Sequence, residues 1–443
     1  MAASLWPTLP WRAILQDRRL GLMLLLGFSA GLPILLVFAT LSAWLRSVGI
    51  ERASIGYLSY VSLAYSLKFL WAPAIDRLDV PGLSPLLGRR RAWMLLSQLV
   101  VIAGIVGMSA GDPASGLTWT VVCALVIAFA SATQDIVVDG WRIDNAPTER
   151  QGLMLASYQF GYAVARICGG AGALLVADNF SWSTAYLAMT VLMGVGVVGC
   201  LLAPKVAAAD PPGRRGFRRA AREAVVEPFL DLARRKGPAL ALILALITLY
   251  RLPDITSGVM ANPLYIDAGF TLSEIAGVSK LYGVWVGIAG ALVGGIAVAR
   301  FGLTTTLLVG GVAASASNLM FAGLAMRGHD LPFLIATISI ENFAGSFAGT
   351  ALIAYMSSLT SPAYVATQYA LLSSLYALPG KFVGGLSGVA VDAYGYPAFF
   401  TMTSAVGIPV ILLCLALRYV RPEEARAAPV LPEPDSHEAT ARA

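Results

Sequence analysis

The chain has 443 residues, of which 13% are charged, whereas soluble proteins average ~25%. Hydrophobic residues make up 57% of the chain and the mean hydropathy is +0.73, which is more apolar surface than a soluble globule can bury. The composition excludes a cytosolic enzyme, a secreted disulfide scaffold and a disordered regulator, and it predicts a membrane protein.

The net charge of +6 does not by itself indicate a nucleic acid partner, because in a membrane protein the placement of the charges matters more than their sum. The only histidines are His329 and His437, which nearly excludes a histidine proton relay. All four cysteines lie in apolar stretches without CxxC spacing, so we interpret them as packing residues: Cys123, Cys168, Cys200 and Cys414. We expect no cofactor, no metal site and no nucleic acid partner.

Twelve apolar stretches have about the ~20 residues that a helix needs to cross a bilayer. They predict an all-α integral membrane protein with twelve transmembrane helices. The first stretch is longer than the apolar region of a signal peptide, so it is interpreted as a retained anchor. The spans lie near 20–46, 54–76, 92–110, 117–142, 151–177, 182–203, 238–266, 273–299, 303–326, 331–359, 364–391 and 396–420.

The basic residues predict the orientation of these spans, because cytoplasmic loops collect Lys and Arg. If the N-terminus is cytoplasmic, 23 of the 31 Lys and Arg lie in cytoplasmic segments and five lie within spans. Only three lie in outside connections: Arg46, Arg52 and Arg327. Both termini are therefore expected in the cytoplasm. The predicted organisation is a cytoplasmic N-terminal segment, a six-helix bundle, a cytoplasmic linker, a second six-helix bundle and a disordered cytoplasmic tail, at 1–19, 20–203, 204–236, 237–420 and 421–443.

The linker holds nine basic residues, and two interpretations remain open for it. It contains a short amphipathic helix that rests on the anionic inner leaflet, or it is only a solvated charge run.

A weak internal repeat relates spans five and eleven. Gln, Ser, a basic residue, Gly-Gly and Asp recur in the same order at offsets of 214 to 217 residues, unless Gly-rich spans match by chance. Two repeated six-helix halves are the architecture of the major facilitator superfamily, in which the substrate binds near the midplane.

Ionisable residues inside spans cost at least ~2.5–3.5 kcal/mol at the bilayer centre, so they usually face a partner or a watery cavity. Nine of them spread over both halves predict a polar central pathway: Lys68, Asp135, Asp139, Arg166, Arg251, Asp254, Lys280, Glu341 and Lys381.

Asp135 and Asp139 lie four residues apart on one helix face. We interpret Asp139 with Arg142 as a salt bridge that locks a cytoplasmic gate, and the deeper Asp135 as a transport residue. Proton carriage needs a carboxylate whose basic neighbour changes during transport. The pairs to test are Asp135 with Arg166 or Lys68, and Glu341 with Lys381 or Lys280; a static ion pair is the alternative for each.

Span seven contains YRLPD at 250–254, where Pro253 removes a helical hydrogen bond beside two charges. The break either lines a binding site or is an ordinary kink with an Arg–Asp pair. The glycine runs at 27–33 and 169–173 favour close helix packing over a phosphate cradle.

The connection between spans two and three has Asp-Arg at 76–77 and Gly-Arg-Arg-Arg at 88–91. It resembles, in stretched form, the facilitator-superfamily motif in which these residues pair with the cytoplasmic end of span four. The resemblance implies a set of gating residues: Asp76, Arg77, Arg89, Arg90, Asp139, Arg142 and Asp144.

Longer strings resemble the AmpG-type muropeptide permeases, in chain order and in both halves. They are GFSAGLP (27–33), LKFLWAPAIDR (67–77), SATQDIVVDGWRID (131–144), IENFAGSFAGTALIAYMSSL (340–359) and ATQYALLSSLYA (366–377). The resemblance implies proton-driven import of N-acetylglucosaminyl-1,6-anhydromuramyl peptides across the inner membrane by a monomer in the bilayer.

The resemblance also implies which side chains contact the ligand, whose carboxylates suit Arg and Lys and whose sugar faces suit aromatic rings. The expected substrate-binding residues are Lys68, Gln134, Arg166, Tyr65, Tyr162, Tyr250, Arg251, Lys280, Tyr282, Asn342 and Lys381. Asp135, Glu341 and Asp254 are the expected proton-coupling residues. The chain departs from the family pattern at Pro253, where Gly is usual, and at Lys381, where Arg is common.

Three alternatives remain at this point. Two of the strings are also similar to acetyl-coenzyme A transporters, a related branch of the superfamily. A membrane-embedded glycan-modifying enzyme or a non-transporting sensor of wall fragments would bind similar ligands, although no sizeable extramembrane loop outside the linker could hold a catalytic cleft.

Overall fold

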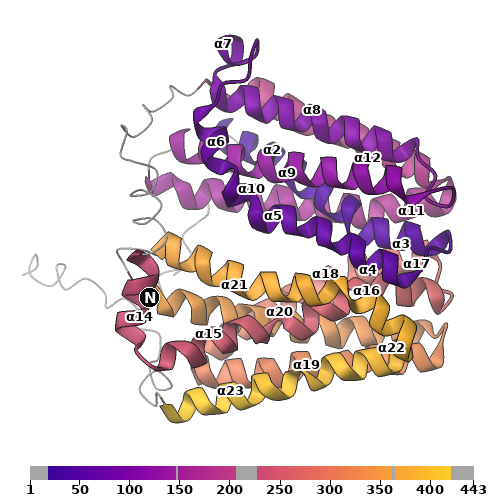
Figure 1. The fold of residues 1–443 in the computed structure, drawn as a ribbon, viewed down its shortest axis with the longest axis vertical. Coiled ribbons are helices and arrows are strands. Elements are labelled where there is room, and N and C mark those ends of the chain that lie inside the picture. The colour runs from indigo at the N-terminus through magenta and orange to yellow at the C-terminus, as the bar shows by residue number, and fades with distance from the viewer. Residues whose placement is uncertain (1–17, 146–147, 206–226, 362–364, 421–443) are drawn as a thin grey trace, which may run out of the picture. The chain divides into compact units, whose positions relative to one another are not determined.

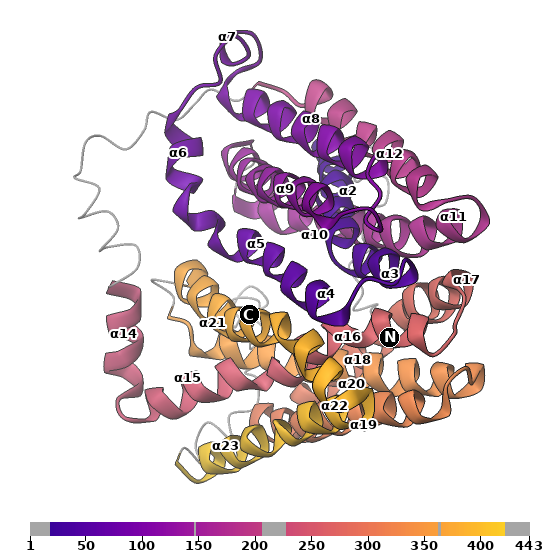
Figure 2. The same ribbon diagram turned by 45° about the vertical axis from the view of Figure 1, so that its right-hand side comes forward.

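A computed structural model describes residues 18–145, 148–205, 227–361 and 365–420, and every regular element in these residues is helical (Figures 1 and 2). The N-terminal part contains α2 (Arg18–Val37), α3 (Ala39–Ser47), α4 (Arg52–Leu58), η1 (Ser59–Ser62), α5 (Leu63–Leu67), η2 (Lys68–Leu70), α6 (Ala72–Arg77), α7 (Ser84–Leu87), α8 (Arg89–Ser109), α9 (Leu117–Asn145), α10 (Thr148–Ile167), η3 (Cys168–Gly172), α11 (Ala173–Asn179) and α12 (Trp182–Leu202).

The C-terminal part begins with the short surface helix α14 and continues with longer, more apolar helices. Its elements are α14 (Glu227–Lys236), α15 (Ala239–Tyr250), α16 (Leu252–Asp267), α17 (Leu272–Ile275), η5 (Ala276–Tyr282), α18 (Gly283–Phe301), α19 (Leu303–Arg327), α20 (Leu331–Leu359), α21 (Val365–Gly385), α22 (Ser387–Ala405) and α23 (Gly407–Val420).

Within the described residues, ten helices are long and apolar enough to cross a membrane. They coincide with all predicted spans except the second and the eleventh. The second span is a series of short helices from α4 to α6, which the ribbon draws end to end (Figure 2). Three serines, two tyrosines and Lys68 lower its hydropathy over residues 59–68. The all-helical membrane fold is therefore confirmed, whereas the number twelve stays a prediction.

The eleventh span continues through α21 into the first half of α22, and Gly395 marks where it ends. Gly395 has a φ of +77°, a left-handed conformation that glycine adopts without a steric penalty. The two predicted C-terminal spans therefore meet inside α22, with the chain reversing at this glycine.

The glycine run at 27–33 packs helices closely, as its sequence predicts. A Cβ atom on Gly27 would lie 2.1 Å from the backbone oxygen of Tyr158, and one on Gly161 would lie 2.0 Å from that of Leu24. Any larger residue at either position would force α2 and α10 apart, because backbone atoms cannot move aside as a flexible side chain can. The two helices carry Ser29 and Tyr158, which belong to the site described below.

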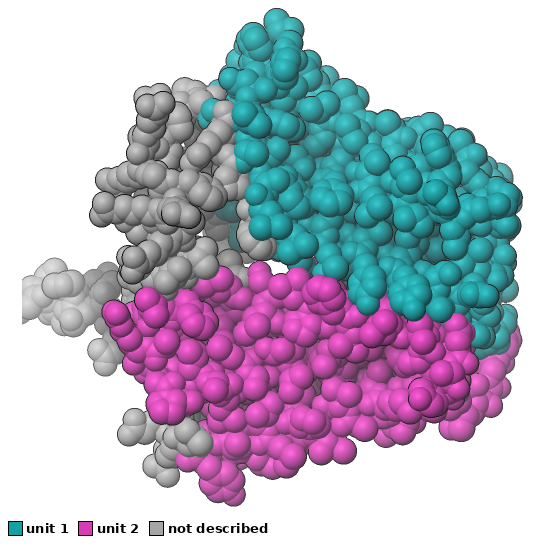
Figure 3. Space-filling model, in the orientation of Figure 1, with its two compact units in different colours: residues 1–214, 262–281 teal, residues 215–261, 282–443 magenta. Residues whose placement is uncertain are grey.

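The described chain divides into two compact units, coloured separately in Figure 3. Unit 1 comprises residues 1–214 and 262–281, and unit 2 comprises residues 215–261 and 282–443. The units follow the two predicted halves except for the segment Asn262–Leu281, which the C-terminal half contributes to unit 1. This segment contains the end of α16, all of α17 and most of η5.

Candidate functional site

Unit 1 contains an ion pair between two neighbouring spans. The Nζ of Lys68 lies 3.5 Å from Oδ2 of Asp135, and these side chains are 34% and 17% exposed. Lys68 opens the 3-10 turn η2 of the broken second span, and Asp135 lies in the middle of α9. The other carboxylate oxygen, Oδ1, is buried and accepts no hydrogen bond. Asp135 thus pairs with Lys68 at a long distance and interacts with Tyr158, and its Oδ1 is an oxygen that can bind a proton.

Three tyrosines lie close to this carboxylate, and an arginine lies close to one of them. Tyr158 and Tyr162 lie one turn apart on α10, with ring centroids 6.1 Å apart, and both are electrostatically coupled to Asp135. Tyr65 packs edge-on against Phe38, and its buried hydroxyl has no hydrogen-bond partner. Arg166 is exposed one turn after Tyr162 and interacts with it electrostatically. The arrangement brings charged, hydroxyl and aromatic groups together, as carbohydrate and carboxylate recognition requires.

A buried amide cluster lies beside Asp135. Gln134 is fully buried, and its Nε2 donates to the hydroxyl of Ser29 at 2.6 Å, while Gln98 from α8 donates to the same oxygen at 3.5 Å. The Oε1 atoms of both glutamines have no partner. The amide of Gln134 lies against Ser29 between helices, and substrate binding by Gln134 stays a prediction. The neighbouring Asp135 therefore lies on a turn of α9 that buried hydrogen bonds fix.

The predicted gating residues lie at the end of unit 1 where α8 begins. The guanidinium of Arg90 covers Gly140 of α9, where a Cβ atom would lie 2.6 Å from its Cζ. Arg142 pairs with Asp139 at 3.4 Å across one turn, as predicted. Arg89 has a buried Nε without a hydrogen-bond partner. The side chains of Asp76, Arg77 and Asp144 lie outside the described residues.

Arg91, which follows the two predicted gating arginines, has a structural contact. Its guanidinium donates to the backbone oxygens of Cys200 at 3.2 Å and Leu201 at 2.8 Å, and Arg18 donates to that of Leu202 at 3.0 Å. These are the last carbonyls of α12, where a helix runs out of its own backbone donors, although the oxygen of Cys200 also accepts from Ala203 at 3.3 Å. The two arginines therefore cap α12.

Unit 2 contains the predicted break in span seven. The helix is interrupted at Arg251, between α15 and α16. Arg251 Nη1 lies 2.8 Å from Oδ2 of Asp254 and also donates to the backbone oxygen of Gly345 at 2.8 Å. Tyr250 is 3% exposed, and its hydroxyl donates to the backbone oxygen of Leu307 at 2.8 Å. Tyr250 therefore packs in the core of unit 2 with its polar group satisfied.

The remaining predicted residues of unit 2 lie mainly on α20. Asn342 donates to Glu341 Oε2 at 2.9 Å and to the backbone of its own helix. Tyr282 is 41% exposed and shares a 2.8 Å hydrogen bond with the hydroxyl of Ser339. Lys381 is half-buried on α21. One cavity of about 590 Å³ in this unit is lined by apolar side chains and by Ser317 and Ser339, from α18, α19 and α20. None of the predicted site residues lines it.

Lys280 belongs to unit 1 and lies in a π-helical turn. Its Nζ donates to Oδ1 of Asn262 at 3.0 Å, and its side chain lies beside Gly170, in the π-helical turn η3. Thr40 donates to the backbone oxygen of Gly169 in that turn at 2.7 Å. Such π-helical turns often mark functional sites. Lys280 thus contacts the N-terminal spans at Gly170, in the glycine run that the sequence singled out, and bonds to Asn262, which it did not single out.

Sequence reasoning missed several members of these groups. Tyr158 precedes the predicted Tyr162 by one helical turn, so their shared face was a usable signal. Ser29 and Gln98 gave no such signal, because Ser29 lies 69 positions from Gln98 and 105 positions from Gln134, the two residues that donate to it. In the described part of the chain, no three His, Cys, Asp or Glu side chains form a group that could hold a metal ion.

Comparison with known proteins identifies the family. Residues 23–276 match the Major Facilitator Superfamily. The chain is 35% identical over 407 residues to the anhydromuropeptide permease of Escherichia coli, covering 91% of this chain and 81% of that protein. It is 32% identical over 406 residues to a Rickettsia felis transporter named AmpG 4, covering 91% of this chain and 97% of that protein.

Solved structures share the fold at much lower sequence identity. The nucleoside transporter NupG superposes with a TM-score of 0.70 at 14% identity, over 90% of this chain and 99% of that chain. A POT peptide transporter in complex with sulfate superposes with a TM-score of 0.69 at 12% identity, over 92% of this chain and 95% of that chain. The chain is thus a multi-pass membrane transport protein rather than an enzyme, and it belongs to the AmpG-type permeases of the major facilitator superfamily.

Proposed function

We propose that this protein imports N-acetylglucosaminyl-1,6-anhydromuramyl peptides across the bacterial inner membrane together with protons, with both termini in the cytoplasm. The observation that carries the proposal is the Asp135–Lys68 ion pair, which joins the membrane-length helix α9 to the predicted second span and leaves one carboxylate oxygen without a hydrogen bond. The relative with 35% identity is named for this class of substrate.

The site supports coupling because a carboxylate that loses its lysine partner in a partly desolvated place binds a proton more readily. Lys68 lies in the broken second span, whose short helices can shift more easily than a continuous helix. When Lys68 moves toward a carboxylate of the ligand, Asp135 loses its counter-charge and takes up a proton. Substrate and proton then bind together, which is the requirement of a symporter.

The residues around the pair suit the proposed ligand. Arg166 and Lys68 supply cations for peptide carboxylates, and Tyr158 and Tyr162 supply aromatic faces for the disaccharide. Unit 2 has polar residues of its own inside a span, Glu341 and Asn342 of α20, which are joined by a hydrogen bond.

Uptake into proteoliposomes with an imposed inward proton gradient tests the proposal. Labelled disaccharide-peptide should accumulate, and unlabelled disaccharide-peptide should compete more strongly than disaccharide, free peptide or acetyl-coenzyme A. Competition by acetyl-coenzyme A alone would assign the protein to the related transporter branch. Accumulation that does not respond to the proton gradient would reject the coupling, and ligand binding without any flux would indicate a sensor.

A further inference from the structure

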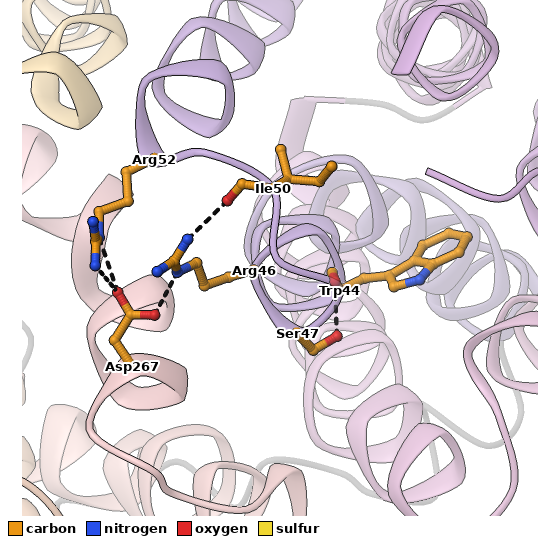
Figure 4. Close-up of polar contacts among 6 residues, drawn as sticks. All are labelled: Trp44, Arg46, Ser47, Ile50, Arg52 and Asp267. Carbon is orange, nitrogen blue, oxygen red and sulfur yellow. Dashed lines mark hydrogen bonds and ion pairs between the residues drawn. The ribbon is translucent and has the colours of Figure 1, made fainter. Parts of the chain in front are cut away.

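A three-residue ion cluster joins parts of unit 1 that lie more than 200 positions apart in the sequence. Asp267 is the last residue of α16, and its two carboxylate oxygens are divided between Arg46 of α3 and Arg52 of α4 (Figure 4). Arg46 donates through Nε to Oδ1, and Arg52 donates through Nε to Oδ2 at 2.9 Å. Arg46 also donates to the backbone oxygen of Ile50 at 3.0 Å, which fixes the intervening loop. We name Asp267, Arg46 and Arg52 the Asp267 clasp.

The positions of the clasp residues are unfavourable for their own helices. Asp267 lies at the C-terminus of α16, where the helix dipole disfavours a negative charge. Arg52 is the first residue of α4, where the dipole disfavours a positive charge. Helix stability therefore explains neither residue, whereas their mutual contact explains both. Each charge is favourable at its position only while Asp267 and the arginines are in contact, which suits a connection that opens and closes.

Further polar contacts hold the rest of the segment Asn262–Leu281 to the N-terminal spans. Asp178 at the end of α11 accepts from the backbone nitrogen of Ser273 at 3.1 Å and from its hydroxyl. Asn262 donates to the backbone oxygen of Ala39 at 3.0 Å and weakly to the hydroxyl of Ser42. The attachment is made by several partly exposed hydrogen bonds and ion pairs, with clasp side chains 17% to 29% exposed. Water can replace such bonds, so the segment can separate without exposing a large charged surface to lipid.

The clasp also lies at the end of the spans that the charge distribution assigns to the outside. Arg46 and Arg52 are two of only three basic residues in the connections that the charge distribution assigns to the outside. The segment itself joins spans seven and eight, and the part of α16 before Asn262 belongs to unit 2. Release of the clasp would free the outer end of these two spans from the loop between spans one and two.

We propose that the Asp267 clasp is the outer gate of the transport cycle, closed in this structure and opened to admit substrate from outside. The proposal rests on the transport function proposed above. The two arginines keep the gate closed by sharing one carboxylate, and the ligand enters while Asp267 is separated from them. The residues of the gate are distinct from the Asp135–Lys68 pair, so opening and proton binding can be measured separately.

Cysteine labelling tests the gate without any substrate. Ser42→Cys, in a background with the four native cysteines replaced, places a thiol where Asn262 covers it in the closed state. The protein is reconstituted in nanodiscs, where a maleimide reaches both faces. We expect Asp267→Asn and Arg46→Gln to raise the labelling rate several-fold, and added salt to raise it in the parent but not in Asp267→Asn. Asp267→Glu should retain the slow rate of the parent.

The matched control is Arg327→Gln, which removes another ion pair of an outside connection, between Arg327 and Asp330 at 3.5 Å. It should leave the labelling rate unchanged. A labelling rate in Asp267→Asn equal to that of the parent would overturn the proposal, and so would equal acceleration by Arg327→Gln. If Asp267→Asn does not fold, Arg46→Gln and the salt dependence of the parent decide the question. If the labelling results are as expected but the protein does not transport muropeptides, the gate proposal stands and the proposed substrate is rejected.

Discussion

Two ion pairs inside membrane spans use the same kinds of residue but differ in construction. Asp135 and Lys68 come from different spans, lie 3.5 Å apart and leave one carboxylate oxygen without a partner. Arg251 and Asp254 are one helical turn apart, lie 2.8 Å apart, and Arg251 also binds a backbone oxygen. The first pair can separate when one span shifts, whereas the second moves as one piece. We therefore expect Asp135, rather than the predicted Asp254, to exchange protons, and we expect the Arg251 pair to brace a broken helix.

The largest expected effect concerns transport. Asp135→Asn should abolish proton-driven accumulation, because an amide cannot carry the proton, while substrate counterflow continues. Asp254→Asn should retain accumulation, because its pair has a structural role. Uptake and counterflow in the same proteoliposomes measure both. If Asp254→Asn loses accumulation and Asp135→Asn keeps it, the two roles are reversed.

The next effect concerns stability. Arg251→Gln should lower the free energy of unfolding by about 1.5–3 kcal/mol, because it removes two bonds of a charged group and leaves Asp254 without its partner. Lys68→Gln should cost less than ~1 kcal/mol, because its pair is longer and more exposed. Thermal unfolding in detergent measures the order of the two variants, and a larger loss in Lys68→Gln would contradict the comparison.

A smaller effect is expected beside Asp135. Ser29→Ala removes the hydroxyl that accepts from Gln134, and it should cost about 1 kcal/mol because a buried amide loses its partner. Ser97→Ala is the matched control, since its buried hydroxyl bonds only to the backbone of its own helix. Equal unfolding temperatures of these variants would show that the amide cluster does not hold α9 in place.

The smallest effect concerns Asp231 on the surface helix α14, where desolvation opposes the hydrogen bonds but does not outweigh them. Hydrogen bonds from Gln368 and then Arg235 hold the pKa of the Asp231 carboxyl below its usual value. Because the pKa of Asp231 is lower in the folded protein, its carboxylate stabilises the fold fully above the ordinary Asp pKa of ~3.9. This stabilisation is lost as the pH falls through the pKa of the folded protein. A spin label at Phe229→Cys on α14 should therefore become more mobile only below about pH 4.

Asp231→Asn provides the control for this titration. The label should then show one mobility over the same pH range, since the carboxyl that titrates is gone. A transition that persists in Asp231→Asn would assign the pH response to another group.

Sequence reasoning predicted those features that depend on residues close together in the chain. Composition and apolar stretches predicted the membrane fold, Pro253 indicated the break in span seven, and the spacing of Asp139 and Arg142 predicted their pair. The sequence offered Arg166 and Lys68 as partners of Asp135. The packing of the second span against α9 brings Lys68 to it.

Other features depend on contacts that local patterns do not encode. Gln134 has the residue type of a ligand-binding group, but its orientation toward Ser29 follows from how α2 and α9 pack. Asp267 had no nearby basic residue, and its partners lie 215 and 221 positions away. Its unfavourable place at a helix C-terminus was the one signal available.

Proton movement during substrate flux tests the central claim most directly. Proteoliposomes containing a pH-sensitive dye receive an inward disaccharide-peptide gradient without any imposed proton gradient. The Asp135–Lys68 account predicts that their interior acidifies with wild-type protein and that Asp135→Asn admits the substrate without acidification. Substrate entry through the wild-type protein at constant internal pH, or equal acidification by Asp135→Asn, would contradict it.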